Sequence, residues 1–166
     1  METIEVIKRR KSNRRYLSKK IANEILEDII DCARLAPSAC NIQPWHFVVV
    51  TDETIKNKIA EFSSLGKFLS QCPAAVLVFG KTYPFVVEDC SAATQNILLA
   101  AEGYGIGSCW IAGYKRPYSK SIAEMMGVPK EYELISIVSL GYVDTDTDRP
   151  RPPKKSLKEV MTYNNF

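Results

Sequence analysis

Apolar and polar residues follow two rhythms along the chain, which predict helices and strands in turn. Residues 21–36 place apolar side chains at positions 21, 25, 26, 29, 30, 33 and 36, which is the spacing of an amphipathic helix, and Pro37 ends it. The stretches HFVVV (46–50) and AAVLVFG (74–80) predict two buried strands. A further strand is predicted over 133–142, and a short one lies within the glycine-containing stretch 105–114.

Capping residues place the other predicted helices. A Ser, Thr or Asp side chain accepts a hydrogen bond from a free N–H at a helix start, and Gly is favoured just past a helix end. The candidate N-caps are Thr3 for a short first helix, Asp52 for a helix through about Phe62, and Ser119 for a helix followed by Gly127. A long helix is predicted over about 87–103, and the chain after residue 143 is polar, rich in proline and extended.

Helices and strands alternate, with helices heavier, which predicts an α/β or α+β sandwich with a small sheet. The chain has 166 residues, 46% hydrophobic and 25% charged, and shows no repeat or linker, so we expect a single domain over 1–166. No apolar run approaches the roughly 20 residues that span a bilayer, and no secretory signal follows Met1. We therefore expect a cytoplasmic protein that does not bind membranes.

Charge is more informative in its distribution than in its total of +3. Residues 1–20 hold eight Lys and Arg against two Glu, a net of +6, so the remainder carries −3. A second basic cluster comprises Arg149, Arg151, Lys154, Lys155 and Lys158. Two local clusters on a near-neutral chain favour a compact anion such as a phosphate group. Nucleic acid is not an expected partner, because no pattern of aromatic residues for stacking bases accompanies the charge.

The sequence lacks the residue patterns of several common kinds of site. The five cysteines are odd in number and form no C-x-x-C pair, which argues against a disulfide framework and against a zinc site. His46 is the single histidine, so no metal site and no catalytic dyad built on histidine is expected. The stretch Gly105-Ile106-Gly107 lacks the third glycine of a dinucleotide-binding fingerprint. The reactivity of Cys40, which lies within a polar loop, is left open.

Three stretches carry candidate binding chemistry. In RRKSNRRY (9–16), Arg10, Ser12 and Arg14 can converge on one phosphate, although a solvated basic face is the plainer alternative. In APSACNIQPWHFVVV (36–50), the side chains of Asn41 and Gln43 offer donors and acceptors that suit the edge of a heterocycle. The alternative for that loop is a hydrogen-bonded turn with Trp45 in the core.

The third stretch, GIGSCWIAGY (105–114), offers backbone rather than side chains. Gly107 and Gly113 allow a ligand to approach the backbone closely, and N–H groups near Ala112 and Gly113 are candidate donors to a ring atom.

These stretches resemble the FMN-dependent nitroreductase family. The resemblance rests on R-K-S-x-R-x-Y near the N-terminus, then A-P-S-A-x-N-x-Q-P-W-H-F, then A-A-T-Q-N-I-L-L-A-A-E-G-Y-G-I-G-S-C-W-I, in the family's order and over nearly the whole chain. It implies an α+β, nitroreductase-like sandwich with a small central, mostly antiparallel sheet flanked by helices. It also implies a homodimer that exchanges its C-terminal tails and binds FMN at the interface.

The resemblance further implies which residues bind FMN, with both subunits contributing. Arg10 and Ser12 would bind the phosphate, Lys11 stands where the family often has a second Arg, and Arg14 would lie at the N1/O2 side of the ring. The other subunit would cover one ring face with Pro37, Ser38 and Ala39. The remaining implied contacts are Asn41 and Gln43 to the ring and ribityl chain, backbone N–H groups of Ala112 and Gly113 near N5 and O4, and Arg151 or Lys154 to the phosphate.

The implied activity is ping-pong hydride transfer from NADH or NADPH to flavin N5, and then to a small-molecule acceptor such as a nitro compound or a quinone. This chemistry takes place on the cofactor and needs no catalytic side chain. The alternatives are a related flavoprotein that dehalogenates or fragments flavin, and a flavin-binding module without turnover. Larger members carry a lid where this chain has only KTYPFVVE (81–88), so an open site is expected, with Tyr83 and Phe85 as rim or core.

Overall fold

The computed structural model describes residues 2–144 and 150–166. Four strands form one antiparallel sheet in the order β1-β2-β4-β3. The strands are β1 (Trp45–Val50), β2 (Ala74–Lys81), β3 (Gly107–Ala112) and β4 (Tyr132–Gly141). The predicted small antiparallel sheet is therefore confirmed, and each predicted strand lies within one or two residues of the observed bounds. The expectation that 46–50 is a buried strand is wrong, because β1 is an edge strand whose His46 and Val49 are exposed.

Five α-helices and three short 3-10 turns complete the described part of the chain. The helices are α1 (Thr3–Arg9), α2 (Asn23–Arg34), α3 (Glu53–Phe62), α4 (Val86–Gly103) and α5 (Ser119–Met125). The turns are η1 (Ala39–Asn41), η2 (Lys67–Gln71) and η3 (Leu157–Glu159). Over the described residues, no helix combines the length and the apolar character that crossing a bilayer requires.

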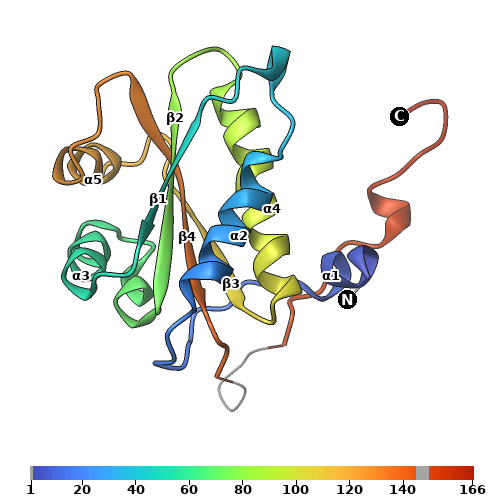
Figure 1. Ribbon diagram of the computed structural model, residues 1–166. Helices are drawn as coiled ribbons and strands as arrows, with labels where there is room; N and C mark the ends of the chain where they lie inside the picture. Colours follow the sequence, from blue (N-terminus) through green and yellow to red (C-terminus); the bar gives the residue numbers. More distant parts are fainter. Residues whose placement is uncertain (1, 145–149) are drawn as a thin grey trace.

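The helices cover both faces of the sheet, which gives the predicted α+β sandwich (Figure 1). Because side chains alternate along a strand, Val76 and Val78 of β2 face the cluster that includes α2 and α4. Leu77 and Phe79 face the opposite cluster, which includes α3 and α5. The central strand β2 is buried from Ala74 to Gly80, as its unbroken apolar run predicts.

The helix caps confirm two predictions and correct two. The carboxylate of Asp52 accepts the N–H of Ile55 at 2.9 Å, so the predicted cap of α3 is confirmed. Gly127 has a φ of +66° just past α5, and its neighbouring N–H groups bond back to the last turn, as predicted for a glycine stop. Thr3 is wrong as a cap, because α1 begins at Thr3 itself and Glu2 precedes it. Ser119 is also wrong as a cap, because its hydroxyl donates to the carbonyl of Gly113 instead.

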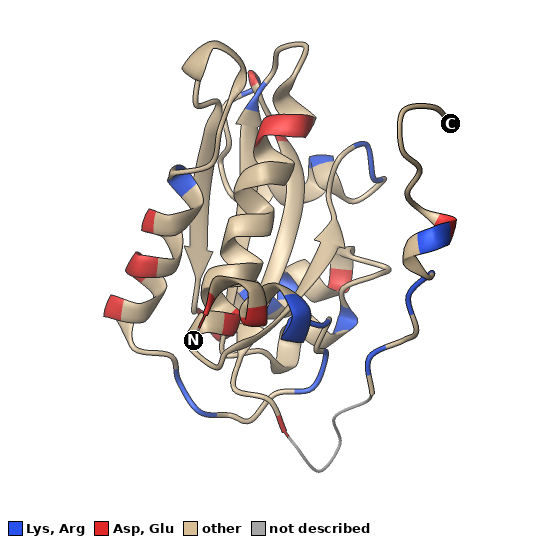
Figure 2. Cartoon of the chain, turned by 90° about the vertical axis from the view of Figure 1, so that its right-hand side faces the viewer, with Lys and Arg blue, Asp and Glu red and all other residues tan. Residues whose placement is uncertain are grey.

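The C-terminal residues leave the body of the molecule as an arm that carries several Lys and Arg (Figure 2). Every residue from 150 to 166 is exposed, which confirms the expectation of an extended tail. One short turn, η3, is stabilised by a capping box between Ser156 and Glu159. Arg149 of the second basic cluster lies outside the described residues. The contact of this tail with a partner subunit stays a prediction.

Candidate functional site

The basic stretch after α1 is attached to the outer edge of β3 at Ser108. The N–H of Asn13 donates to the carbonyl of Ser108 at 2.8 Å, and Ser12 pairs with Ser108 in a parallel bridge. The hydroxyl of Tyr16 donates to the carbonyl of Asn13 and lies 2.6 Å from the hydroxyl of Ser139. Burial raises the pKa of Tyr16 far above its ordinary value, so it stays a neutral donor. The predicted ligands Arg10, Lys11, Ser12 and Arg14 are thus held together at one sheet edge.

Arg14 extends from this edge toward η2. Its guanidinium lies 5.9 Å from the centre of the Phe68 ring, within the range of a cation–π contact. Phe68 was not predicted as a site residue, because a single aromatic residue in a short turn carries no spacing signal. Cys109 lies below Ser12 and Arg14, and burial raises the pKa of its thiol although both neighbours act in the opposite direction. This half of the site therefore offers cations and a hydroxyl, with no thiolate beside them.

The end of β3 corrects one predicted donor. The N–H of Gly113 donates to the carbonyl of Ile135 at 3.0 Å, so the expectation of a free N–H on Gly113 is wrong. Antiparallel ladders alternate, and the N–H of Ala112 therefore points away from β4, toward the open edge of the sheet. Its carbonyl accepts from the hydroxyl of Tyr118. Of the two predicted backbone donors, Ala112 alone faces the outer edge of β3, to which the basic stretch is attached at Ser108.

The two glycines of this region pack against their own chain, which differs from the expectation that they admit a ligand. A Cβ on Gly113 would lie 2.9 Å from the backbone carbon of Ile135. A Cβ on Gly107 would lie 2.4 Å from a methyl group of Val143. Both positions need glycine because β4 and the chain after it approach too closely for a side chain.

The predicted ring-binding loop, residues 37–43, is folded on itself. The hydroxyl of Ser38 accepts the N–H of Gln43 at 2.9 Å, and the Gln43 amide donates to the carbonyl of Asn41 at 3.3 Å. Cys40, Asn41 and Gln43 have φ values of 49°, 55° and 52°. Left-handed backbone is unfavourable for residues other than glycine, so this short loop concentrates strain.

A buried carboxylate that the sequence analysis missed holds this loop. The N–H of Ala39 donates to both oxygens of Asp89, at 3.1 and 3.3 Å, and the hydroxyl of Tyr83 donates to the same carboxylate. Asp89 lies in the first turn of α4 and is 6% exposed. Its signal in the sequence was an acidic residue beside buried positions of a helix, which does not by itself identify a partner.

The two predicted halves of the site lie at opposite ends of α4. The loop is bonded to Asp89 in the first turn, whereas Arg9, next to Arg10, pairs with Glu102 in the last turn at 3.5 Å. At a rise of 1.5 Å per residue, the thirteen steps from Asp89 to Glu102 correspond to about 20 Å along the helix. One chain therefore does not bring its own loop to its own basic stretch.

The two tail candidates differ in placement. Arg151 donates to the carbonyl of Lys8 in α1, which puts its guanidinium near the basic stretch. Lys154 is exposed, and no hydrogen bond or ion pair joins it to another described residue. The geometry favours Arg151 of the two predicted alternatives.

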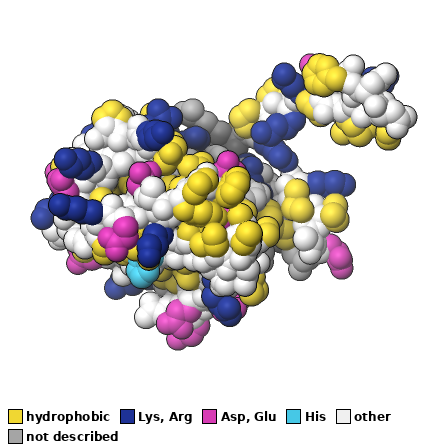
Figure 3. Space-filling model, turned by 90° about the horizontal axis from the view of Figure 1, so that it is seen from above, with side chains coloured by type: hydrophobic (Ala, Val, Ile, Leu, Met, Phe, Trp, Pro, Cys, Tyr) yellow, Lys and Arg dark blue, Asp and Glu magenta, His cyan; other side chains and the backbone are white. Residues whose placement is uncertain are grey.

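Exposed apolar side chains gather on the end of the molecule that carries η1 and the β2–α4 connection (Figure 3). Leu35, Ile42 and Phe85 are each more than half exposed there. Tyr83 is half-buried and packs against the core, so the two aromatic residues of the connection divide between core and rim. Trp45 is also half-buried against the core, as the plainer reading of the loop expects.

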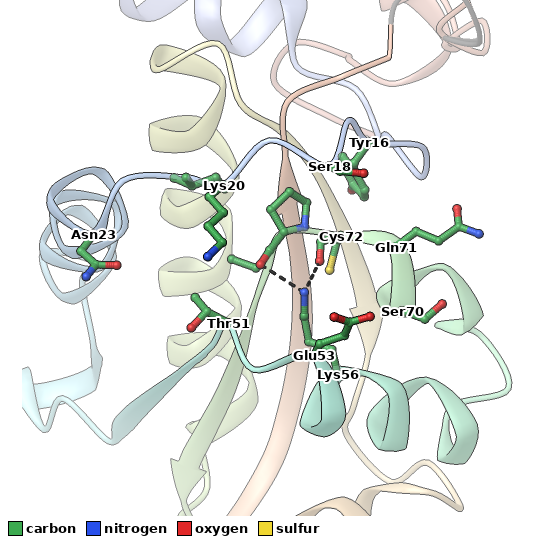
Figure 4. A pocket seen from close by; sticks show the side chains of 13 residues that line it. Tyr16, Ser18, Lys20, Asn23, Thr51, Glu53, Lys56, Ser70, Gln71 and Cys72 are labelled. Carbon is green, nitrogen blue, oxygen red and sulfur yellow. Dashed lines mark hydrogen bonds between the residues drawn. The ribbon is translucent and has the colours of Figure 1, made fainter.

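A separate cavity of about 660 Å³ lies behind Tyr16 (Figure 4). Lys56 is 6% exposed, and its ammonium donates to the carbonyls of Cys72 at 2.6 Å and Pro73 at 3.2 Å. None of the predicted cofactor ligands lines this cavity. We interpret Lys56 as the group that fixes the turn before β2, which in turn positions η2 and Phe68.

The cysteines differ in burial. Cys72, Cys90 and Cys109 are buried, and all five thiols are free. Burial raises the pKa of Cys72 to about 11 and that of Cys90 to about 12. Cys40 is exposed.

Comparison with known proteins identifies relatives over most of the chain. The model of the nitroreductase family matches residues 7–66 and 66–142. A protein of Archaeoglobus fulgidus, provisionally named an NADH dehydrogenase/NAD(P)H nitroreductase, is 42% identical over 154 residues, covering 89% of this chain and 88% of its own. The solved structure of an FMN-dependent nitroreductase from Clostridium difficile R20291 superposes with a TM-score of 0.91 at 30% identity, covering 98% of this chain and 99% of its own. An iodotyrosine deiodinase of Thermotoga neapolitana is 29% identical, covering 98% of this chain and 97% of its own.

Proposed function

Since the chain belongs to the nitroreductase family, we propose that it is an FMN-dependent oxidoreductase that transfers electrons from NADH or NADPH to a small-molecule acceptor. The observation that carries this proposal is the attachment of the basic stretch 10–14 to the outer edge of β3, where Ser12 and Asn13 pair with Ser108. That edge ends in the outward-facing N–H of Ala112. Cations for a phosphate are thus attached near the start of β3, and a backbone donor for a ring lies at the end of the same edge strand.

The residues present fit FMN in charge and in kind. Arg10, Lys11 and Ser12 offer two cations and a hydroxyl for the phosphate, and Arg151 approaches from the tail. Arg14 would place a permanent positive charge beside the ring, which favours states of the cofactor with more negative charge. The N–H of Ala112 would donate to a ring atom. When bound, FMN supplies the group that accepts a hydride and passes electrons on.

We further propose that the working unit is a homodimer in which the loop 37–43 of one copy covers the flavin held by the other. The separation of about 20 Å along α4 supports this, because one chain cannot complete the site. The exposed tail supports it too. Leu157, Val160 and Tyr163 are more than 60% exposed on their own chain, and a second copy would bury them.

Light scattering of the purified protein tests the dimer. We expect twice the chain mass of 18.7 kDa in the presence of FMN. A stable monomer that retains bound FMN would contradict the shared site.

The acceptor class follows from the short connection between β2 and α4. Only Thr82–Phe85 separate Lys81 from Val86, and Phe85 is 53% exposed. A connection of four residues covers little of the site, so we propose an open site that accepts nitro compounds and quinones. Because a deiodinase is among the relatives, 3-iodotyrosine is the discriminating competitor substrate. Faster turnover with 3-iodotyrosine than with a quinone would favour dehalogenation instead.

The first experiment is an absorption spectrum of the purified protein, before and after NADH or NADPH is added without oxygen. We expect a flavin spectrum that bleaches, and the nucleotide that bleaches it is the donor. A flavin spectrum that persists with both nucleotides would indicate a flavin-binding module without this turnover. A colourless protein that cannot be reconstituted with FMN would overturn the proposal.

A further inference from the structure

The carboxylate of Asp89 is buried where a charge is expensive, and two donors compensate it. It receives the N–H of Ala39 and the hydroxyl of Tyr83, and it is 6% exposed. A buried carboxylate without hydrogen-bond donors would be strongly unfavourable. Its position in the first turn of α4 adds the favourable interaction of a negative charge with a helix start. The group is thus built into the fold rather than placed at the surface by chance.

The bond from Ala39 to Asp89 is also what ties the loop to the body. Within residues 37–43, the remaining hydrogen bonds join loop residues to one another, such as Gln43 to Ser38. Just after the loop, the carbonyl of Pro44 accepts the N–H of Lys81. Among the residues that the structure describes, therefore, Asp89 is the group outside the loop that forms hydrogen bonds to residues 37–43.

The loop needs such a tie because its backbone is strained. Cys40, Asn41 and Gln43 all have positive φ. Conformations of this kind persist when the surrounding structure holds them, and they cluster at binding sites. A loop released from Asp89 has a direct route to relax, since its side chains are mostly exposed.

We propose that Asp89 is a positioning residue of the cofactor site: its carboxylate holds residues 37–43 in the shape that covers the flavin, and it joins that loop to the β2–α4 connection through Tyr83. The role in shaping the loop stands on the geometry alone, and the role toward the flavin rests on the proposed function. Asp89 touches neither cofactor nor substrate. It acts through the backbone of Ala39.

Asp89→Ala tests the proposal, with Glu88→Gln as the matched control. Glu88 lies in the same helical turn, is exposed and forms no hydrogen bond with the loop. The readout is hydrogen exchange at the amide of Gln43, whose bond to Ser38 does not involve Asp89 and therefore reports the shape of the loop. We expect at least tenfold faster exchange and at least tenfold weaker FMN binding in Asp89→Ala, and wild-type values in Glu88→Gln. Asp89→Asn, which keeps an acceptor for Ala39, should restore part of both.

The loop side of the same bond gives a second test that keeps Asp89 and the helix intact. Ala39 is the first residue of η1 and follows the extended Ser38, a position that tolerates proline while removing the N–H. Ala39→Pro should weaken FMN binding as much as Asp89→Ala does, and the double variant should be no weaker than either. A double variant whose loss of FMN affinity is the product of the two single losses would overturn the proposal.

The outcomes separate the two proposals. Faster exchange with unchanged FMN affinity in Asp89→Ala overturns the positioning role and leaves the proposed function intact. A wild-type protein that binds no FMN overturns the proposed function, and exchange at Gln43 then decides whether Asp89 shapes the loop. If Asp89→Ala does not fold, the same two measurements, exchange at Gln43 and FMN binding, are made on Ala39→Pro and Tyr83→Phe, each of which removes one donor to Asp89.

Discussion

The two halves of the proposed site are held in opposite ways. The stretch 12–17 is attached through its backbone, by a bridge from Ser12 to Ser108 and another from Tyr16 to Val143. The loop 37–43 makes no bridge to the sheet, and one buried carboxylate ties it to the body. The first half thus behaves as an added edge of the sheet, and the second as a strained cover with a single anchor.

This difference indicates a division of labour. A phosphate and a ring edge need fixed charges, and backbone pairing fixes them at low cost in strain. The loop 37–43, which is proposed to meet a second subunit and an incoming substrate, benefits from an anchor that can be released. Its strained backbone favours a change of conformation once the hydrogen bond to that anchor is lost. We therefore expect variants of the first half to lower cofactor affinity directly, and variants of the second to act through the shape of the loop.

The largest expected effect is on the first half. Arg14→Ala removes the charge proposed to lie beside the ring and the contact with Phe68. A hydrogen bond to a charged group contributes about 1.5–3 kcal/mol, so FMN affinity should fall by roughly tenfold or more. Fluorescence titration with FMN measures this. Arg15→Ala, an exposed neighbour of the same charge, is the control. Equal affinities for both variants would remove Arg14 from its role.

The next effect tests how the first half is attached. Tyr16→Phe deletes the hydroxyl that bonds to the carbonyl of Asn13 and to the hydroxyl of Ser139. Leaving buried polar groups unpaired costs about 1–3 kcal/mol, which urea unfolding measures as a lower midpoint with an unchanged slope. Exchange at Gln43 should stay at its wild-type rate, since the loop has a separate anchor. Faster exchange at Gln43 would show that the two halves are coupled within one chain.

How far the sequence predicts these features depends on the range of the interaction. The strand β2 follows from a continuous apolar run, because burial on both faces needs no partner to be specified. The caps at Asp52 and Gly127 follow for the same reason, since both act within their own helix. The prediction of Ser119 as a cap is wrong for a physical reason: in the folded chain its hydroxyl donates a hydrogen bond to the carbonyl of Gly113.

The site residues also divide into those that act through local chemistry, which the sequence predicts, and those that depend on long-range contacts, which it does not. The residue types around Arg10–Arg14 indicate phosphate binding from local chemistry, and the structure places them on one edge. The free N–H expected on Gly113 was lost to Ile135, which belongs to a strand more than twenty residues away. Asp89 and Ala39 are fifty residues apart, and no local pattern links them. What the sequence missed are pairs that only the completed fold brings together.

The smallest expected effect concerns strain in the cover itself. Cys40 has a φ of 49°, is exposed and has no hydrogen-bond partner among the described residues. Left-handed backbone costs about 1–2 kcal/mol in a residue with a side chain. Glycine avoids that cost but loses about 0.5–1 kcal/mol of chain entropy on folding. Cys40→Gly should therefore raise the free energy of unfolding by about 0.5–1 kcal/mol.

The same replacement in the other half should have the opposite sign. Arg15 is exposed and is absent from the residues with positive φ, so Arg15→Gly brings the entropic cost without the relief and should destabilise by about 0.5–1 kcal/mol. Urea unfolding of both variants measures the pair. Opposite signs would show that strain is confined to the loop that Asp89 anchors. Destabilisation by both would mean that the left-handed residues of the loop are no more strained than the backbone-paired edge, which would remove the physical reason for an anchor that can be released.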